Sequence, residues 1–99
     1  MSHVVRTAEG TITIPDSVLA QIVRRAAETV DGARVRRPRR GLEVELDGAR
    51  AAVTLELAAR YGTVLPDLAR EVQEHVSDAL ASMCGFDVQR VDLAIEELS

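Results

Sequence analysis

Arginine is concentrated in one short segment, where its side chains could carry binding chemistry. Residues 34–40 contain five arginines: Arg34, Arg36, Arg37, Arg39 and Arg40. A guanidinium group presents parallel N–H donors that match the oxygens of a phosphate, so the cluster is a candidate site for RNA, nucleotides or anionic lipid headgroups. The alternative is an exposed loop whose charge is partly neutralised by the two glutamates that follow, Glu43 and Glu45.

A second candidate group surrounds His75. Glu71 precedes it and Asp78 follows it at helical spacing, so the three side chains share one face of a helix. This spacing is tolerable for a metal ion or an acid–base pair. That face is the polar side of an amphipathic helix, however, and no other ligand type lies within reach in the sequence. We therefore interpret the group as a solvated helix face and expect no metal site.

The remaining reactive side chain is the single cysteine, Cys84. It has no histidine beside it in a catalytic motif, so we expect it to pack beside Met83 and Phe86 instead of acting as a nucleophile. A glycine-rich phosphate loop, a CxxC pair and an HExxH element are all absent from the sequence. These absences predict a non-enzymatic protein with no cofactor and no small-molecule substrate.

Length and composition restrict the classes that remain. A chain of 99 residues with 46% hydrophobic residues has room for one core, so we expect a single domain over residues 1–99. Only 2% of the residues are aromatic, which disfavours RNA readout by base stacking. No apolar run approaches the roughly 20 residues needed to span a bilayer, and no secretory leader is evident. We expect a cytoplasmic protein with a net charge of −4 and an uneven charge distribution.

Two stretches have apolar residues at the steps of three and four that indicate an amphipathic helix. The first follows a candidate N-cap at Ser17 and ends near Asp31 and Gly32. The second has Pro66 in its first turn and is terminated by Gly85. The predicted apolar faces are Val18, Leu19, Ile22, Val23, Ala26, Ala27 and Val30 in the first helix, and Leu65, Leu68, Ala69, Val72, Val76, Ala79, Leu80 and Met83 in the second.

Alternating residues and turn signals predict the strands. Short strands are expected at 11–14 and 33–37, and a longer one at 88–96. In the last of these Val88 is out of phase with the following valine and isoleucine positions, which predicts a bulge or bend near Gln89.

A hairpin is expected in the middle of the chain. Asp47 and Gly48 suit a two-residue type I′ turn. Pairing outward from that turn predicts the partners Leu46 and Ala49, Glu45 and Arg50, Val44 and Ala51, and Leu42 and Val53. This register collects Leu42, Val44, Leu46, Ala49, Ala51, Val53, Leu55 and Leu57 on one apolar face and leaves the charged residues on the other.

The elements together predict the fold class. The order β-α-β-β-β-α-β is typical of an α+β domain built as a two-layer sandwich. We expect a mixed sheet with the β-hairpin at its centre and the two amphipathic helices covering one face. The other face would be polar or would meet a partner.

One set of residues follows a pattern that extends over nearly the whole chain: Gly10, Ile12, Ile14, Val18, Ile22, Ala26, Val30, Gly32, Tyr61, Gly62, Pro66, Val72, Gln73, Val76, Met83, Gly85, Val88 and Val91. The pattern is most specific in the second half, which contains a tyrosine-glycine pair, a valine-glutamine pair and a methionine-x-glycine pattern. On these residues the sequence resembles the alkaline shock protein family, the Gls-type envelope stress response proteins of bacteria. The chain departs from the family at Cys84, where threonine is usual, at Asp92, where asparagine is common, and in the arginine-rich segment.

The resemblance implies a non-enzymatic interaction or scaffold protein that acts in the envelope stress response or in envelope homeostasis. It also implies a cytoplasmic protein, peripheral at the inner face of the cell membrane, that is held there by a small integral membrane protein and self-associates into oligomers. The alternative, which comes from the residues themselves, is an anion-binding module that uses segment 34–40 on RNA or acidic lipid.

A binding experiment distinguishes the scaffold interpretation from the anion-binding alternative. If the arginine cluster binds anions, an Arg37→Glu, Arg40→Glu variant should lose binding to anionic vesicles or RNA, because reversed charges repel phosphate. Binding of the unchanged protein should also weaken steeply as salt rises. Vesicle co-sedimentation and RNA gel shift measure both effects, and unchanged binding by the variant would remove the anion-binding interpretation.

Overall fold

The structure is a computed structural model that describes residues 2–7, 9–36 and 42–98 of the chain. Its helices and strands follow one another as β1 (Ser2–Thr7), β2 (Gly10–Pro15), α1 (Asp16–Glu28), β3 (Ala33–Val35), β4 (Leu42–Asp47), β5 (Arg50–Arg60), α2 (Leu65–Cys84) and β6 (Asp87–Leu98). From β2 onward this is the predicted order, and β1 is an addition that the sequence pattern did not predict.

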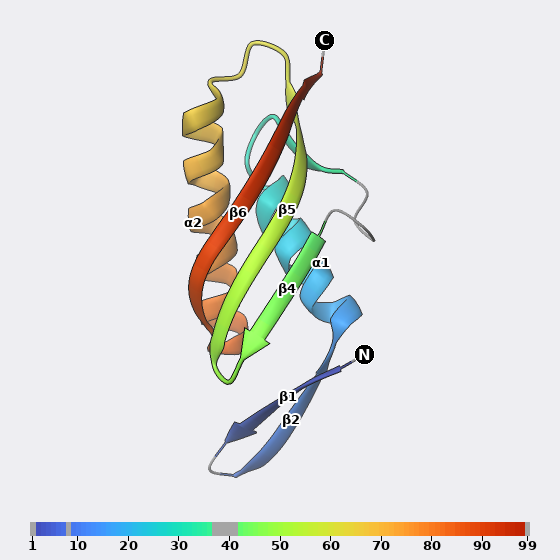
Figure 1. The fold of residues 1–99 in the computed structure, drawn as a ribbon, viewed down its shortest axis with the longest axis vertical. Coiled ribbons are helices and arrows are strands. Elements are labelled where there is room, and N and C mark those ends of the chain that lie inside the picture. The colour runs from blue at the N-terminus through green and yellow to red at the C-terminus, as the bar shows by residue number, and fades with distance from the viewer. Residues whose placement is uncertain (1, 8, 37–41, 99) are drawn as a thin grey trace.

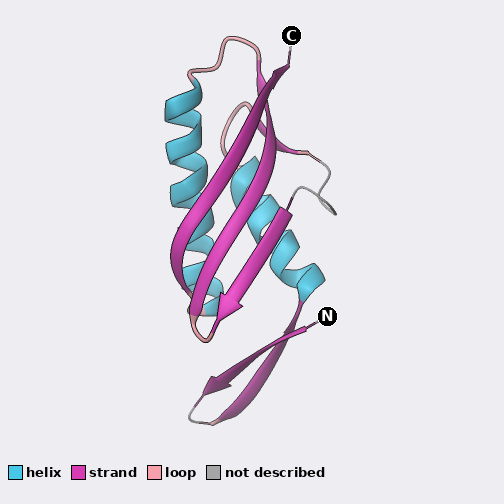
Figure 2. Cartoon of the chain, in the orientation of Figure 1, coloured by secondary structure: helices cyan, strands magenta, loops and turns pink. Residues whose placement is uncertain are grey.

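Strand β5 is the centre of the main sheet. Along one edge it pairs antiparallel with β3 and β4 one after the other, and along the other edge it pairs parallel with β6. Parallel neighbours need a long connection, and α2 supplies it between β5 and β6. Both helices cover the same face of this sheet, which confirms the predicted α+β, two-layer architecture with a mixed sheet (Figures 1 and 2).

The hydrophobic core lies between the helices and the sheet. From β5 the side chains of Val53, Leu55 and Leu57 are fully buried, as the alternating pattern predicts. Each helix contributes one residue per turn at the predicted spacings. The buried helix residues are Leu19, Val23 and Ala27 of α1 and Leu68, Val72, Val76 and Leu80 of α2.

Two large members of the predicted helix faces are exposed. The side chains of Val18 and Met83 are 41% and 68% exposed. After α2 ends, Phe86 folds back, its amide donates to the Leu80 carbonyl, and its ring is buried. Phe86 therefore covers the core below the last turn of α2, where the periodicity of the helix alone predicted Met83. Cys84 is partly buried against the core, close to this fold-back.

The predicted register of the β4–β5 hairpin was wrong by two residues. The last pair is Asp47 with Arg50, and Leu46 pairs with Ala51, so the turn is formed by Gly48 and Ala49. Gly48, the first residue of this turn, has a positive φ of 62°. Because side chains alternate with a period of two, a shift of two keeps the predicted buried and exposed faces intact, with Ala49 in the turn as the exception.

The predicted irregularity in the last strand is confirmed. Ala51 pairs with Val88, but the next residue, Ala52, pairs with Arg90, so Gln89 has no partner in the ladder. This extra residue is a bulge that returns Val91 to the buried face. The strand is also longer than predicted at both ends.

The ends of α1 differ from the prediction. The helix begins at Asp16, with Pro15 as an extended N-cap residue that makes no side-chain capping bond, so Ser17 is inside the first turn and is not the cap. A proline fixes the backbone for a helix start without needing a capping hydroxyl. At the other end the helix stops at Glu28, and a turn through Thr29 leads into β3.

The β1–β2 hairpin stands apart from the main sheet. The two strands pair only with each other, from Ser2 opposite Pro15 to Thr7 opposite Gly10. They extend the molecule along its long axis, which measures 49 Å (Figure 1). Hairpin and core are joined directly where β2 continues into α1.

The C-terminal end of α2 provides a test of backbone conformation. Gly85 has φ 73° and an added Cβ would meet nothing within 4 Å. Gly85→Ala should therefore lower the free energy of unfolding by about 1 kcal/mol through the left-handed backbone alone, and Gly85→Asn should lower it less. Urea denaturation of both variants measures the difference, and an alanine variant as stable as the parent would contradict this helix end.

Burial of Cys84 provides a test of pH dependence. Desolvation raises the pKa of its thiol above the ordinary value, so the folded chain favours the neutral form. This contribution to stability is complete below the thiol pKa of the unfolded chain and is lost as pH rises through the folded pKa.

At pH 8 iodoacetamide should therefore alkylate Cys84 more slowly in the folded protein than in urea, and the difference should narrow as pH rises. Mass spectrometry of quenched samples measures both rates on the chain's one thiol. Equal rates at pH 8 would contradict the burial of this side chain.

Candidate interaction surface

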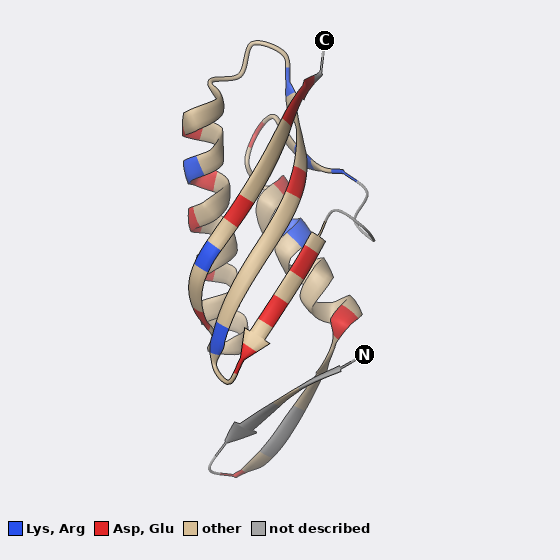
Figure 3. Cartoon of the chain, viewed as in Figure 1, with Lys and Arg blue, Asp and Glu red and all other residues tan. Residues whose placement is uncertain are grey.

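The sheet face turned away from the helices carries many charged side chains, and we call it the outer face. Figure 3 shows acidic positions along β4 and both acidic and basic positions on β5 and β6. Small side chains such as Ala52, Thr54 and Ala94 lie between the charged ones. The charged residues that the register places there are Arg34 and Arg36 near β3, Glu43, Glu45 and Asp47 on β4, Arg50, Glu56 and Arg60 on β5, and Arg90, Asp92 and Glu96 on β6.

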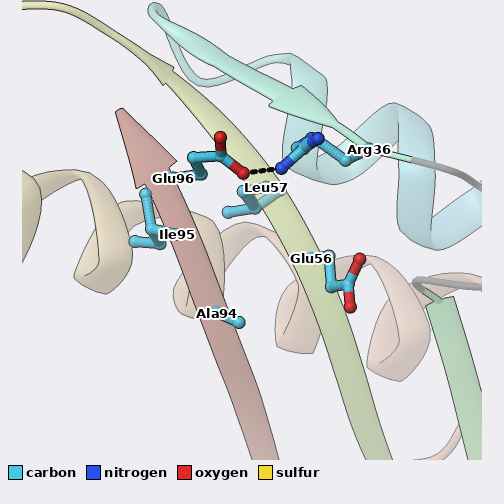
Figure 4. A pocket seen from close by; sticks show the side chains of 6 residues that line it. All are labelled: Arg36, Glu56, Leu57, Ala94, Ile95 and Glu96. Carbon is cyan, nitrogen blue, oxygen red and sulfur yellow. Dashed lines mark hydrogen bonds and ion pairs between the residues drawn. The ribbon is translucent and has the colours of Figure 1, made fainter. Parts of the chain in front are cut away.

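Arg36 lies across β5 and is tied to acidic neighbours. Its guanidinium group forms an ion pair with the carboxylate of Glu96, and its amide donates to the Glu56 carbonyl at 2.9 Å (Figure 4). A shallow hollow of about 400 Å³ lies beside these three side chains. Because two carboxylates border it, this hollow is poorly suited to a phosphate.

Arg34 is exposed and forms no ion pair with any other described residue. It lines a second, open hollow of about 610 Å³ at the end of β5, together with Arg60 and Tyr61. Arg60 is held there by an ion pair with Asp31, with 2.7 Å between its Nη2 and the carboxylate oxygen Oδ1. Asp31, Gly32, Ala33 and Ala58 complete the lining.

The tyrosine-glycine pair of the family pattern lies at this second hollow. Gly62 has φ 86°, which lets the chain turn out of β5, and leaves the Tyr61 ring 70% exposed. Val64, the residue before α2, is 61% exposed on the same connection. We call Arg34, Arg60, Tyr61 and Val64 the β5-end patch.

The predicted arginine cluster is thus only partly placed. Arg34 and Arg36 lie on the outer face, and Arg37, Arg39 and Arg40 lie outside the described residues. The sequence predicted Glu43 and Glu45 as the neutralising groups, whereas the carboxylate paired with Arg36 is Glu96. Arg60 was missed, although its place immediately before Tyr61-Gly62 was a usable signal.

The histidine group has a structural role. Nδ1 of His75 lies 2.8 Å from Oγ1 of Thr29, whose hydroxyl is 2.6 Å from the Ala26 carbonyl. The hydroxyl has one proton and donates it to that carbonyl, so it accepts from the imidazole and joins α2 to the end of α1. Among residues 2–7, 9–36 and 42–98 no three His, Cys, Asp or Glu side chains are grouped so as to hold a metal ion.

The other family-pattern residues are distributed along α2. Pro66 is in the first turn and Gly85 ends the helix in the left-handed conformation, as predicted. The Gln73 amide donates to the Val91 carbonyl at 3.1 Å, so it fixes α2 against β6. Met83 is exposed at the end of the helix remote from Tyr61. Within the described part of the chain, α1 and α2 are both too short or too polar to cross a membrane.

Solved structures with a similar fold include C-terminal domains of MamM. The copper form of one variant has a TM-score of 0.57 and 18% identity, and the match covers 84% of this chain and 98% of that one. A cadmium form has the same TM-score and 19% identity, with 84% and 96% covered. At these identities the likeness shows the fold alone. No curated protein sequence matches the chain.

The sequence itself matches a protein-family model over residues 4–99. The model describes the alkaline shock protein 23 family, with a cell envelope-related function. The match extends over both helices, the main sheet and most of the β1–β2 hairpin. The chain therefore belongs to the alkaline shock protein family, whose function is related to the cell envelope.

Proposed function

We propose that this protein is a non-enzymatic scaffold at the cytoplasmic side of the bacterial envelope. In this role it is held near the membrane by a small integral membrane protein and associates with further copies of itself. The envelope stress response or envelope homeostasis is the process that such a scaffold would serve. The observation that carries the proposal is the β5-end patch, where an exposed aromatic ring and an exposed arginine line one hollow.

The chemistry of this patch supports docking of a protein. Tyrosine and arginine are enriched among the residues that dominate binding energy in protein interfaces, since both combine apolar area with hydrogen bonding. Tyr61 and Val64 are among the large apolar residues that are exposed in the described part of the chain. Gly62 turns the chain out of β5, and the Asp31–Arg60 ion pair lies beside the two side chains that this turn presents.

The anion-binding alternative keeps one supporting observation. Arg34 has no carboxylate partner among the described residues and opens onto the larger hollow. A phosphate held there would be released by salt, whereas a contact through Tyr61 and Val64 would survive a high-salt wash. Retention of the bound partner after a high-salt wash therefore distinguishes the two proposed functions.

A tagged protein purified from its own gently solubilised cells provides the test. The parent should retain a stoichiometric small membrane protein through a high-salt wash. Tyr61→Ala combined with Val64→Ser should reduce the retained partner by at least tenfold, since truncating a central aromatic residue costs about 2 kcal/mol or more. Quantitative mass spectrometry and nucleic-acid measurement of each eluate give the result.

Val18→Thr is the matched control, because Val18 is another exposed apolar side chain and lies in the first turn of α1, outside the β5-end patch. It should retain the partner at the parent level. Equal capture by the Tyr61, Val64 variant and the parent would contradict the role of the patch. RNA that elutes with salt and depends on Arg34 would favour the anion-binding alternative.

A further inference from the structure

The charges of the outer face are arranged so that the face is complementary to itself. Positions along β5 define levels on this face, because every strand of the main sheet is paired to it. Arg36 is at the level of Glu56, and Arg34 is at the level of Ala58. On the same edge of β5, Glu43 is at the level of Thr54 and Glu45 at the level of Ala52. Along this edge, Arg34 and Arg36 thus lie on the Arg60 side of Leu55, and Glu43 and Glu45 lie at the matching levels on its Arg50 side.

Rotation by 180° about an axis that runs in front of the outer face, parallel to the sheet and perpendicular to the strands at the level of Leu55, exchanges these levels. It brings Arg36 opposite Glu43 of a second copy and Arg34 opposite Glu45 of that copy. By symmetry each pair forms twice, as in any isologous interface. We infer that the outer face is a face-to-face dimer interface whose occupant is a second copy of this chain.

The opposite edge of the sheet obeys the same rotation. Arg90 is at the level of Ala52 and Glu96 is at the level of Ala58, so the rotation places Arg90 opposite Glu96 of the second copy. Between the two charged edges it places Ala52 opposite Ala58, whose own side chain is already buried within its chain. The same rotation axis therefore pairs opposite charges on both edges of β5, on β3 and β4 at one edge and on β6 at the other.

The carboxylates of β4 are available for this contact. Glu43 and Glu45 are exposed and form no ion pair with any other described residue. Arg36 is bound to Glu96 of its own chain, but a guanidinium group has five N–H donors and can serve a second carboxylate. The one like-charge opposition that the rotation creates is Arg50 with Arg60, and Arg60 already has Asp31 beside it.

The size of the face sets the expected strength. Three strands about 4.8 Å apart, each with roughly ten residues at about 3.3 Å, give a face of about 500 Å². Burial on both copies then removes about 1,000 Å², near the lower limit for a specific interface. The dimer should therefore be weak, concentration-dependent and sensitive to salt. Such a dimer would form mainly where the scaffold is locally concentrated. This inference names a surface for the self-association within the proposed function and does not depend on the membrane partner.

Charge reversal tests the dimer. Sedimentation velocity of the full chain over a concentration series in 50 mM NaCl should show a monomer–dimer equilibrium, and 500 mM NaCl should weaken it about tenfold. A Glu43→Arg, Glu45→Arg variant should remain monomeric, because every arginine on that edge then faces another arginine. An Arg34→Glu, Arg36→Glu variant should also remain monomeric, because every glutamate on that edge then faces another glutamate.

Mixing the two variants provides the decisive measurement. In the mixed dimer each arginine faces a glutamate again, so the mixture should dimerise at least tenfold more tightly than either variant alone. The matched control is Glu71→Arg, Glu74→Arg, which makes the same charge change on the exposed side of α2 and should dimerise like the parent.

Circular dichroism confirms folding of each variant, since all the substituted side chains are on the surface. A parent that is monomeric throughout the series at 50 mM NaCl would overturn the inference, and so would a mixture no tighter than its components. Capture of the membrane partner is read separately in the purification experiment, so failure of the dimer and failure of the scaffold role are distinguishable.

Discussion

The fold depends on burial of one face of β5. This strand pairs along both edges, and its residues Val53, Leu55 and Leu57 are fully inaccessible. Removal of each of these side chains from water contributes about 1.5–3 kcal/mol to the free energy of folding. No other described strand has as many fully buried side chains. The helices, the second hollow and the levels of the outer face are all positioned relative to this strand. Its ends determine where Tyr61 leaves the sheet and where Asp87 enters it.

Local patterns predicted the layers of the fold but not its exact pairing. The alternation of apolar residues in β4 and β5 is a local property, and it defined the buried face correctly. The register depends on which two residues form the turn, and Asp47 was assigned to the turn when it belongs to the strand. A shift of two residues leaves the pattern unchanged, so the sequence contained little information against it. The bulge at Gln89 was predictable because it interrupts the alternation itself.

The site was predicted where residue type was sufficient and missed where distant residues meet. Arg34, Arg36 and Tyr61 were recognisable from composition or from the family pattern. The ion pairs that place them join residues far apart in sequence: Arg36 and Glu96 are 60 positions apart, and Arg60 and Asp31 are 29 apart. Only the sheet brings such positions together. Met83 shows the converse error, because helical periodicity cannot anticipate that Phe86 folds back beneath the last turn.

The β1–β2 hairpin has a consequence for the local stability of the chain. A two-stranded hairpin with little packing against a core is marginal by itself. Its strands meet each other, with only a small contact between β2 and α1. Amide hydrogen exchange in β1 should therefore proceed through local opening, without the cooperative unfolding that exchange in β5 requires. The molecule accordingly has two levels of cooperativity, and substitutions in the hairpin can alter its shape while the core stays at full stability.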